Sequence, residues 1–477
     1  MVACLTSIRR ERRPTTNRLW VPLGRQGDFE NPARIGCSGQ GGPRGACRGH
    51  HREVASRRSV APKARRDYHR RMDSPDIQVP DTTTVPATAD LVVIGGGILG
   101  CATAFHAASR GLRVVVLEHG RRLGGLTTQA AGGGHRLQFD TPEEIALLKR
   151  SLAEWDAFGD VIGEPGIDLR RHRNGYLWVT RDLARAERQR EQVARQQELG
   201  VDGVAWLDGD EARRAFPFLA PEVVGARSRP NDGWLDQLVA TTAYARAAMR
   251  LGAIFAFEAS VTAFGVASGR VTEVRSTRGA VACGWAIVAA GPFTGAVLKL
   301  AGVDVPLAPR VRQRLVLTNA PEVPSYAGMT IDEDTGSHWR PEGGGGYVLR
   351  PDPEAPVTEA SHDPPATRAF YDLLLDPRSP VAVALHAPFW ADVWARRTQH
   401  WYVTAGQYTY SPDHKPLLGP TAIPNLGING GYSGHGIMAS PSGSRLALEA
   451  LLGVIAPEVN PFRYDRPFAY DGSRGPL

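Results

Sequence analysis

Residues 90–118, DLVVIGGGILGCATAFHAASRGLRVVVLE, decide the fold of this chain. The apolar run at residues 90–94 is typical of a buried parallel strand. Residues 98–110 predict a helix that stops at Gly111, and residues 113–118 predict a second strand. This order and length indicate a βαβ unit, and therefore a parallel sheet with a crossover helix.

The turn between the first strand and the helix matches G-x-G-x-x-G. In this motif Gly95 makes the tight turn, Gly97 lets the backbone approach a pyrophosphate, and Gly100 lets the helix pack closely on the strand. The helix begins at Ile98, and its N-terminal end offers unpaired N–H groups to phosphates. Glu118 ends the second strand, where its carboxylate can accept hydrogen bonds from a ribose. These five residues predict a dinucleotide site.

Length and composition point to a globular protein. The chain has 477 residues, of which 42% are hydrophobic, enough for two or three domains with a sizeable core. The longest apolar runs, such as residues 286–290, are much shorter than the roughly 20 residues that span a bilayer, so no membrane span is expected. Only Cys101 and Cys283 lie beyond residue 71, without spacing suited to disulfides or zinc. We therefore expect a cytoplasmic protein without a metal site.

Positive charge is concentrated at the N-terminal end. Residues 1–71 contain 17 Lys and Arg against 5 Asp and Glu, a charge of +12, whereas the whole chain carries +7, which leaves −5 for the rest. We expect residues 1–84 to be a disordered basic tail and linker. One interpretation is translated sequence upstream of a start at Met72, and the alternative is an Arg-rich organellar targeting peptide. No recognition pattern accompanies the charge, so no nucleic-acid partner is expected.

Further elements follow along the chain. Helices are predicted at residues 142–158, 182–199, 236–251 and 442–452, strands within 253–290, and Pro- and Gly-rich loops within 303–365. A second glycine-rich stretch, residues 343–346, precedes a strand-like segment and is predicted to be a hairpin or loop. The chain therefore shows one dinucleotide turn, with no second turn for a nicotinamide nucleotide.

Five blocks together resemble the D-amino-acid oxidase superfamily of FAD-dependent oxidoreductases, in particular its sarcosine oxidase, dimethylglycine dehydrogenase and glycine oxidase branches. The blocks are the Gly95 turn with Glu118, GGLTTQAAGG at 124–133, DGWLD at 232–236, AIVAAGP at 286–292, and SPD at 411–413 followed by GGYSGHG at 430–436. The resemblance covers residues 88–465 approximately. It implies that the dinucleotide is FAD.

The resemblance implies an α/β fold, with a Rossmann-type FAD-binding domain and a second α+β substrate domain on an antiparallel or mixed sheet. We expect the FAD-binding domain to be discontinuous. Its predicted parts are residues 85–175, 235–305 and 405–465, and those of the substrate domain are 176–234 and 306–404. Residues 466–477 are expected to form a C-terminal tail.

The same resemblance implies further FAD contacts beyond the glycine turn. The residues so implicated are Arg121, Thr127, Thr128 and Ala130 around the ribityl chain and flavin, Val261 at the adenine, Gly291 on the far side, and Gly434, His435 and Gly436 near the flavin pyrimidine. Covalent relatives attach the flavin through a His where this chain has Gln129, or through a Cys where it has Gly406. Non-covalent FAD is therefore expected.

The resemblance also suggests how a substrate would bind. Arg136 is the first candidate for a carboxylate anchor and Arg340 the second, although either could instead form a surface or interdomain ion pair. His435 could polarise substrate or flavin, or only cap a turn, and Tyr408 could wall the site or belong to the core. Sarcosine oxidases place a carboxylate-binding Lys where this chain has Met438, so the substrate contacts must differ.

The expected reaction is oxidation of the C–N bond of a small amino acid or N-methyl amino acid, by hydride transfer to flavin N5 and hydrolysis of the resulting imine. The electron acceptor could be oxygen, a quinone or an electron-transfer protein. No Lys lies near residues 346–349, where sarcosine oxidases activate oxygen, which favours a dehydrogenase. The alternative is an FAD-binding subunit of a hetero-oligomeric amine dehydrogenase, or an electron-relay component.

Overall fold

The structure is a computed structural model that describes residues 84–352, 354–397 and 400–468. The predictions for the basic tail, including Met72, and for residues 469–477 lie outside the described residues. In the described part, no helix is long and apolar enough to cross a membrane.

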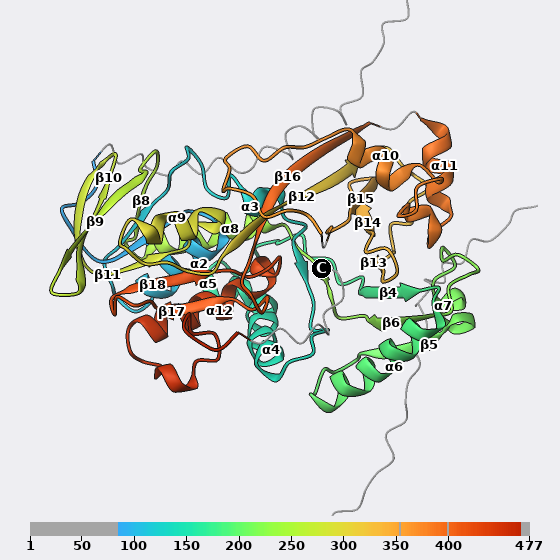
Figure 1. Cartoon of the computed structure of the whole chain (residues 1–477), viewed down its shortest axis with the longest axis horizontal. Coiled ribbons are helices and arrows are strands. Elements are labelled where there is room, and N and C mark those ends of the chain that lie inside the picture. The colour runs from blue at the N-terminus through green and yellow to red at the C-terminus, as the bar shows by residue number, and fades with distance from the viewer. Residues whose placement is uncertain (1–83, 353, 398–399, 469–477) are drawn as a thin grey trace, which may run out of the picture. The chain divides into compact units, whose positions relative to one another are not determined.

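One of the two large sheets is mainly parallel (Figure 1). Its strands, in spatial order, are β17 (Leu417–Pro420), β18 (Leu426–Gly430), β11 (Gly279–Val288), β1 (Thr88–Ile94), β2 (Val114–Leu117) and β8 (Ile254–Ala256). β1 pairs in parallel with both β2 and β11, and only β17 runs antiparallel to its neighbour on this path. An antiparallel pair, β9 (Val261–Ala267) and β10 (Arg270–Ser276), continues from β11. The predicted Rossmann-type βαβ unit is confirmed.

Both faces of this sheet are buried, as the continuous apolar run predicted. Leu91 and Val93 of β1 belong to one core cluster, and Val92 and Ile94 belong to the cluster on the opposite face. The first cluster includes residues of α2 (Ile98–Ala108), α4 (Pro142–Asp156), α5 (Phe158–Ile162), α8 (Gln237–Arg250) and α12 (Gly436–Leu451). The short η1 (Gly291–Phe293) and α9 (Thr294–Lys299) follow β11, and the second cluster contains Leu298 of α9.

A second, mixed sheet of eight strands confirms the predicted antiparallel or mixed architecture. Its order is β16 (Trp401–Tyr410), β12 (Ala308–Leu317), β15 (Gly345–Leu349), β14 (His338–Glu342), β13 (Met329–Asp332), β4 (Tyr176–Thr180), β6 (Gly225–Arg229) and β5 (Ala205–Asp208). Only β13 and β4 pair in parallel. On one face, called here the outer face, residues such as Leu315 and Trp339 pack on α10 (Ala369–Leu375), η2 (Val383–Leu385) and α11 (Phe389–Arg396) (Figure 1).

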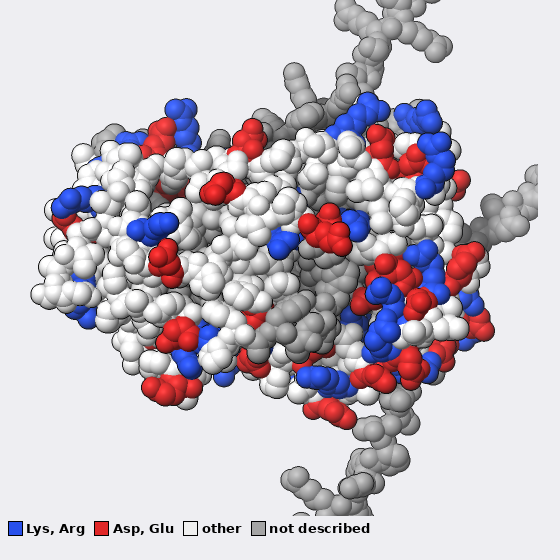
Figure 2. All heavy atoms as spheres, viewed as in Figure 1, with Lys and Arg blue, Asp and Glu red and all other residues white. Residues whose placement is uncertain are grey.

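The opposite, inner face of the second sheet presents Tyr176, Trp178 and Tyr347. It faces residues 129–136, because Arg314 of β12 donates to the carbonyls of Gln129 and Ala131. That segment begins within α3 (Thr127–Ala130) and contains β3 (Gly134–His135), which pairs with β7 (Gly233–Trp234). The remaining helices are α6 (Leu183–Glu198), α7 (Gly209–Ala215) and η3 (Pro457–Val459). Over α6 and α7, Lys and Arg are interspersed with Asp and Glu (Figure 2).

Three predicted elements need correction. The last helix begins at Gly436 and not at 442, because Pro441 is accommodated within it and the Ile437 carbonyl accepts the Ser440 hydroxyl at 3.0 Å. The helix predicted at 142–158 ends at Asp156, since Ala157 leaves helical geometry before α5 begins. Residues 303–365 contain four strands. The hairpin and strand-like segment predicted around residues 343–349 are confirmed by β15 and its pairing with β14. The other strands were not predicted, and in β12 charged side chains alternate with apolar ones.

The predicted domain division follows membership of the two sheets, with one exception. The boundary between 404 and 405 falls inside β16, all of which pairs with β12. The division into two domains stays a prediction. The predicted C-terminal tail also begins too early, since Arg466 is buried and pairs with Asp413 at 2.7 Å.

The Asp413–Arg466 pair gives a test of this packing. Asp413→Asn removes a charge from a buried pair whose arginine then stays uncompensated, which we expect to cost about 3 kcal/mol of unfolding free energy. Asp465→Asn breaks the exposed pair with Arg463 and should cost less than about 1 kcal/mol. Denaturant unfolding of both variants measures the difference. Equal losses would contradict a stabilising role for the buried pair.

Candidate active site

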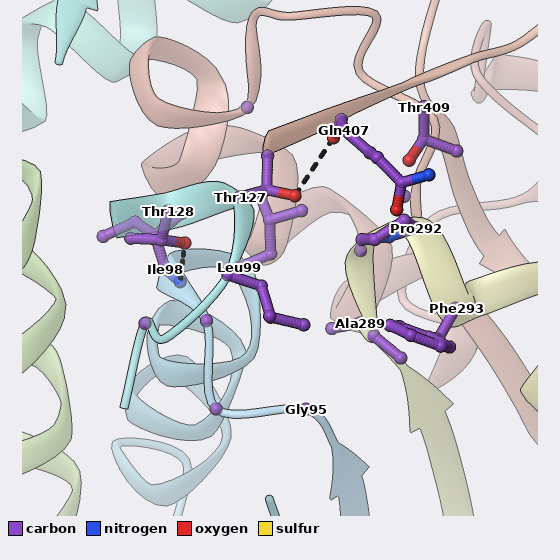
Figure 3. Close-up of a pocket in the computed structure, with 18 of the residues that line it drawn as sticks. Gly95, Ile98, Leu99, Thr127, Thr128, Ala289, Pro292, Phe293, Gln407 and Thr409 are labelled. Carbon is purple, nitrogen blue, oxygen red and sulfur yellow. Dashed lines mark hydrogen bonds between the residues drawn. The ribbon is translucent and has the colours of Figure 1, made fainter. Parts of the chain in front are cut away.

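An elongated cavity of about 300 Å³ lies along the carboxyl ends of the parallel strands (Figure 3). The glycine turn after β1 forms one wall, and residues 430–434, 436 and 437 at the start of α12 form another. Residues Ala289, Pro292 and Phe293, which follow β11, lie across from Leu99 of α2 (Figure 3). Ligands of open parallel sheets bind at this edge.

Close backbone approach shapes the glycine turn. Gly95 adopts a φ of 107°, and a Cβ there would meet the Ala289 carbonyl oxygen at 2.6 Å. A Cβ on Gly100 would overlap the Gly95 carbonyl oxygen. Gly97 is the N-cap of α2 and has no side-chain cap, while the next amide, of Ile98, donates to Thr128 Oγ1 at 3.2 Å (Figure 3). The turn therefore presents backbone and the positive end of a helix to the cavity, which suits a pyrophosphate.

Glu118 lies at the same wall. Its carboxylate accepts the Gly96 and Gly120 amides, each at 2.6 Å. These two bonds orient the carboxylate beside the glycine turn, where a ribose hydroxyl could donate to it. Val261, at the start of β9, and Gly291 also line the cavity. The structure therefore brings the predicted adenosine contacts together.

The other end of the cavity is formed by the start of α12. Gly434 and Gly436 line it, and Gly434 adopts a φ of 95°. A Cβ on Gly434 would approach the Tyr408 ring to 2.6 Å, so glycine is required by both conformation and space. The N-terminus of a 16-residue helix stabilises negative charge at this end.

Thr127 ties this wall to the second sheet. Its hydroxyl donates to the Gln407 carbonyl of β16 at 3.0 Å, and Figure 3 shows the two side by side. The buried Gln407 side chain in turn accepts the Ser361 amide and donates to the Glu359 carbonyl. Sequence reasoning missed Gln407, because its role depends on a loop that is distant in sequence.

A stack of rings lies at the cavity as well. His362 stacks on His119 with ring centroids 4.1 Å apart and on Phe293 at 4.2 Å. All three residues line the cavity. Burial is the main cause of a lowered pKa at His362, which favours the neutral ring. No local pattern in the sequence identified this stack.

These features fit FAD. Backbone amides and two helix N-termini can meet the diphosphate and the flavin pyrimidine, and Glu118 can meet the ribose. The glycines leave the space that a Cβ would fill. A side chain at Gly406 would meet the Ala130 Cβ at 2.6 Å, so this position has no room for a tethering cysteine.

Arg136 lies beside the start of α12. Its guanidinium donates to the Gln138 carbonyl and lies 3.2 Å from His435 Nε2, over the rings of Phe139 and Trp178. Among the described residues, no carboxylate lies within ion-pair distance of it. Burial lowers its pKa to about 10, so the group is still charged at neutral pH. A buried cation with no counter-ion suits an anionic ligand.

Arg340 lies elsewhere on the inner face. It pairs with Glu342, donates to the Gly132 carbonyl at 3.2 Å, and lies over Trp234 and Tyr347. Its charge is therefore already compensated. Tyr408 lines the cavity, and burial raises the pKa of its hydroxyl.

Three other predicted residues lie outside the cavity wall. Arg121 points to solvent, with 87% of its side chain exposed, and pairs with Glu258 at 2.8 Å. The structure does not bring this side chain to the cavity, because it follows β2 on the outside of the turn. Ala130 lines a neighbouring cavity of about 570 Å³ that also touches Thr127. His435 packs edge-on against Phe139, between Arg136 and the start of α12.

Comparisons with known proteins match most of this chain. A family model described as FAD dependent oxidoreductase (DAO) matches residues 90–450. Glycine oxidase of Bacillus licheniformis is 33% identical over 45% of this chain and 57% of its own length. Human mitochondrial sarcosine dehydrogenase is 26% identical over 74% of this chain and 38% of its own length. The matches thus span 38% to 57% of the length of these two relatives. The solved glycine oxidase of Geobacillus kaustophilus has a TM-score of 0.69 at 22% identity, covering 80% of this chain and all of its own.

Gly100 provides a test of the cofactor cradle. Gly100→Ala should weaken FAD binding by at least about tenfold, because its Cβ separates the helix from the turn. Gly295→Ala, in α9, is the matched control, since its Cβ would meet only Val305 at 3.9 Å. The ratio of flavin to protein absorbance after purification reports the occupancy. Full flavin content in Gly100→Ala would contradict the close-packing argument.

Proposed function

Since this chain belongs to the DAO family of FAD-dependent oxidoreductases, we propose that it oxidises the C–N bond of a small amino acid or N-methyl amino acid, of the glycine, sarcosine or dimethylglycine type. The protein is a flavoprotein that binds FAD. The single observation that supports the substrate class is Arg136, a buried guanidinium without a carboxylate partner among the described residues, beside the flavin end of the cavity.

When bound, FAD would supply the oxidising power for this reaction, since its N5 atom can accept a hydride from the substrate carbon next to nitrogen. The substrate nitrogen then shares its lone pair with that carbon, and water hydrolyses the C=N bond to a carbonyl compound and an amine. The protein has to orient the C–H bond and exclude water, and it needs no strong base if the amine binds neutral.

The residues of this chain divide these tasks. Arg136 holds the substrate carboxylate, and His435 keeps the guanidinium in place at 3.2 Å. Tyr408, beside Gly434, walls the space next to the helix N-terminus. Tyr176 and Tyr347 belong to the inner face of the second sheet, and burial raises the pKa of each hydroxyl. These phenols therefore stay neutral and can donate hydrogen bonds.

We assign the FAD as non-covalent and the enzyme as a dehydrogenase. Gln129 and Gly406 replace the attachment residues, and Gly406 has no space for a side chain. No Lys is among the described residues that line either cavity. Arg314 does line the second cavity, but its nitrogens donate to Thr404, Ala131 and Gln129.

The test of the function is an anaerobic reduction screen. N-Methylglycine, dimethylglycine and glycine should bleach the flavin absorbance of the purified single chain, whereas 2-hydroxy acids should not. If amines and amino acids all fail to bleach it, the alternative role as an FAD-binding subunit of a larger complex is favoured.

Substitution of Arg136 tests the carboxylate anchor. Arg136→Gln should lower kcat/KM about 100-fold, since charge-assisted hydrogen bonds contribute about 1.5–3 kcal/mol. Arg136→Lys should recover part of this loss, because it restores the charge without the planar fork. Arg173→Gln, at an exposed arginine paired with Asp156, is the control. Flavin content must match across the variants, and an unchanged KM in Arg136→Gln would rule out the anchor.

The electron acceptor is tested separately. Substrate-reduced enzyme should be reoxidised many times faster by a soluble quinone than by dissolved oxygen, because no lysine ammonium lines the described cavity walls. Stopped-flow absorbance of the flavin measures both rates. Rapid reoxidation by oxygen would identify an oxidase and leave the amine chemistry intact.

A further inference from the structure

Arginines occupy alternate positions on the inner face of the second sheet. β6 provides Arg227 and Arg229, which lie directly opposite Trp178 and Tyr176 of β4. Residues directly opposite each other on neighbouring strands project to the same face. Arg227 therefore shares the face, and the immediate surroundings, of Trp178.

Most of the other arginines on the inner face form ion pairs or hydrogen bonds that explain why they are there. Arg229 pairs with Asp232 and Asp202, and Arg340 pairs with Glu342. Arg314 donates to three oxygens, and Arg312 donates to the Tyr410 hydroxyl at 3.0 Å.

Arg227 differs from these. It is 2% exposed, and its Nε and Nη1 have no hydrogen-bond partner. No carboxylate within the described residues lies in ion-pair distance of it. Its guanidinium stacks 4.8 Å from the centre of the Trp178 ring, whose Nε1 is also buried without a partner. Two opposed residues thus present three nitrogen atoms whose N–H groups have no partner, and an oxygen anion would satisfy them.

The acid with the largest electrostatic effect on Arg227 is Glu333. Glu333 does not form an ion pair with it, and burial raises the pKa of the Glu333 carboxyl. A carboxyl that shifts toward its neutral form compensates the guanidinium less and repels an incoming anion less.

Arg227 is also close to the proposed substrate anchor. Arg136 lies over the same indole, 5.2 Å from its centre, so the two guanidinium carbons are within about 10 Å of each other. The Arg227 charge lowers the pKa of Arg136, although less than burial does. Two buried cations around one ring, neither of them in an ion pair with a carboxylate of the described residues, favour a ligand with two negative groups.

We propose that the substrate is a dicarboxylic amino acid or N-methyl amino acid, whose α-carboxylate binds Arg136 and whose second carboxylate binds Arg227 and Trp178 Nε1. This inference rests on the proposed function and adds the substrate class. The second carboxylate takes no part in the oxidation. It positions the substrate.

Equilibrium binding gives the first test, independent of turnover. Succinate should bind the holoenzyme at least about tenfold more tightly than its monoamide, succinamate, which has the same shape with one charge fewer. Perturbation of the visible flavin spectrum and the shift in thermal unfolding temperature both measure binding. Equal affinities for the two ligands would overturn the inference.

Variants test whether Arg227 causes the preference for succinate over succinamate. Arg227→Gln should abolish the preference for succinate, and Arg227→Met should do the same if the Gln variant folds poorly. Both should leave the unfolding temperature without ligand equal or higher, because they remove an uncompensated buried charge. Arg190→Gln is the matched control, since Arg190 also lies over a tryptophan, Trp206 at 5.5 Å, but is exposed. Loss of the preference in Arg190→Gln, or its survival in both Arg227 variants, would contradict the assignment.

Anaerobic flavin reduction gives the second test. N-Methylaspartate should be preferred to N-methylasparagine in kcat/KM by the wild type and by Arg190→Gln, and not by Arg227→Gln. Reduction by N-methyl amino acids without this preference would overturn the inference and leave the proposed function intact. A succinate preference without reduction by any amine would support the anion site and contradict the proposed function.

Discussion

The close approach of Gly100 to the Gly95 carbonyl is the contact on which the rest of this structure depends, because no side chain fits between them. It brings the N-terminus of α2 to the carboxyl end of β1. α2 is buried and packs on α8 and α12, so its position also sets theirs. The Ile98 amide then binds Thr128 in α3, and the neighbouring Thr127 binds β16. One tight turn thus connects the cofactor cradle to the second sheet.

The two walls of the site differ in their electrostatics for a physical reason. The parallel sheet meets the cavity with backbone amides and helix ends, which stabilise phosphate and reduced flavin without a fixed countercharge. The second sheet and the segment that faces it carry guanidinium groups whose flat faces pack on aromatic rings, as Arg227 of β6 and Arg136 after β3 do on Trp178. Stacking compensates part of the desolvation of a cation, but it supplies no negative charge. Under the proposed function, substrate selection therefore falls to the second sheet and the segment that faces it.

Local sequence patterns were sufficient to predict those parts of the structure that depend on residues close together in the chain. The apolar run before Gly95, the glycine spacing and the acid at Glu118 predicted the βαβ unit and its ligand class. In β12 the alternation Arg310, Arg312, Arg314 was visible as well, but a strand with charged residues at every second position does not show which face is buried. Only the pairing register shows that these arginines point inward. Gln407 and His362 depend on a loop returning from far along the chain, and no local rule reaches them.

Asp232 explains why the positive charge on the inner face persists. It is fully buried and lies close to Arg136, Arg227 and Arg229, so it could in principle neutralise their charge. Its Oδ1 accepts a hydrogen bond from the backbone amide of Leu137 at 3.0 Å and pairs with Arg229. Its Oδ2 accepts a hydrogen bond from the side-chain amide of Gln138, also at 3.0 Å. These bonds hold the segment that carries Arg136, and they give both oxygens of the Asp232 carboxylate a partner. One acid thus compensates one of three cations and fixes the position of a second, so the remaining charge is available to a ligand.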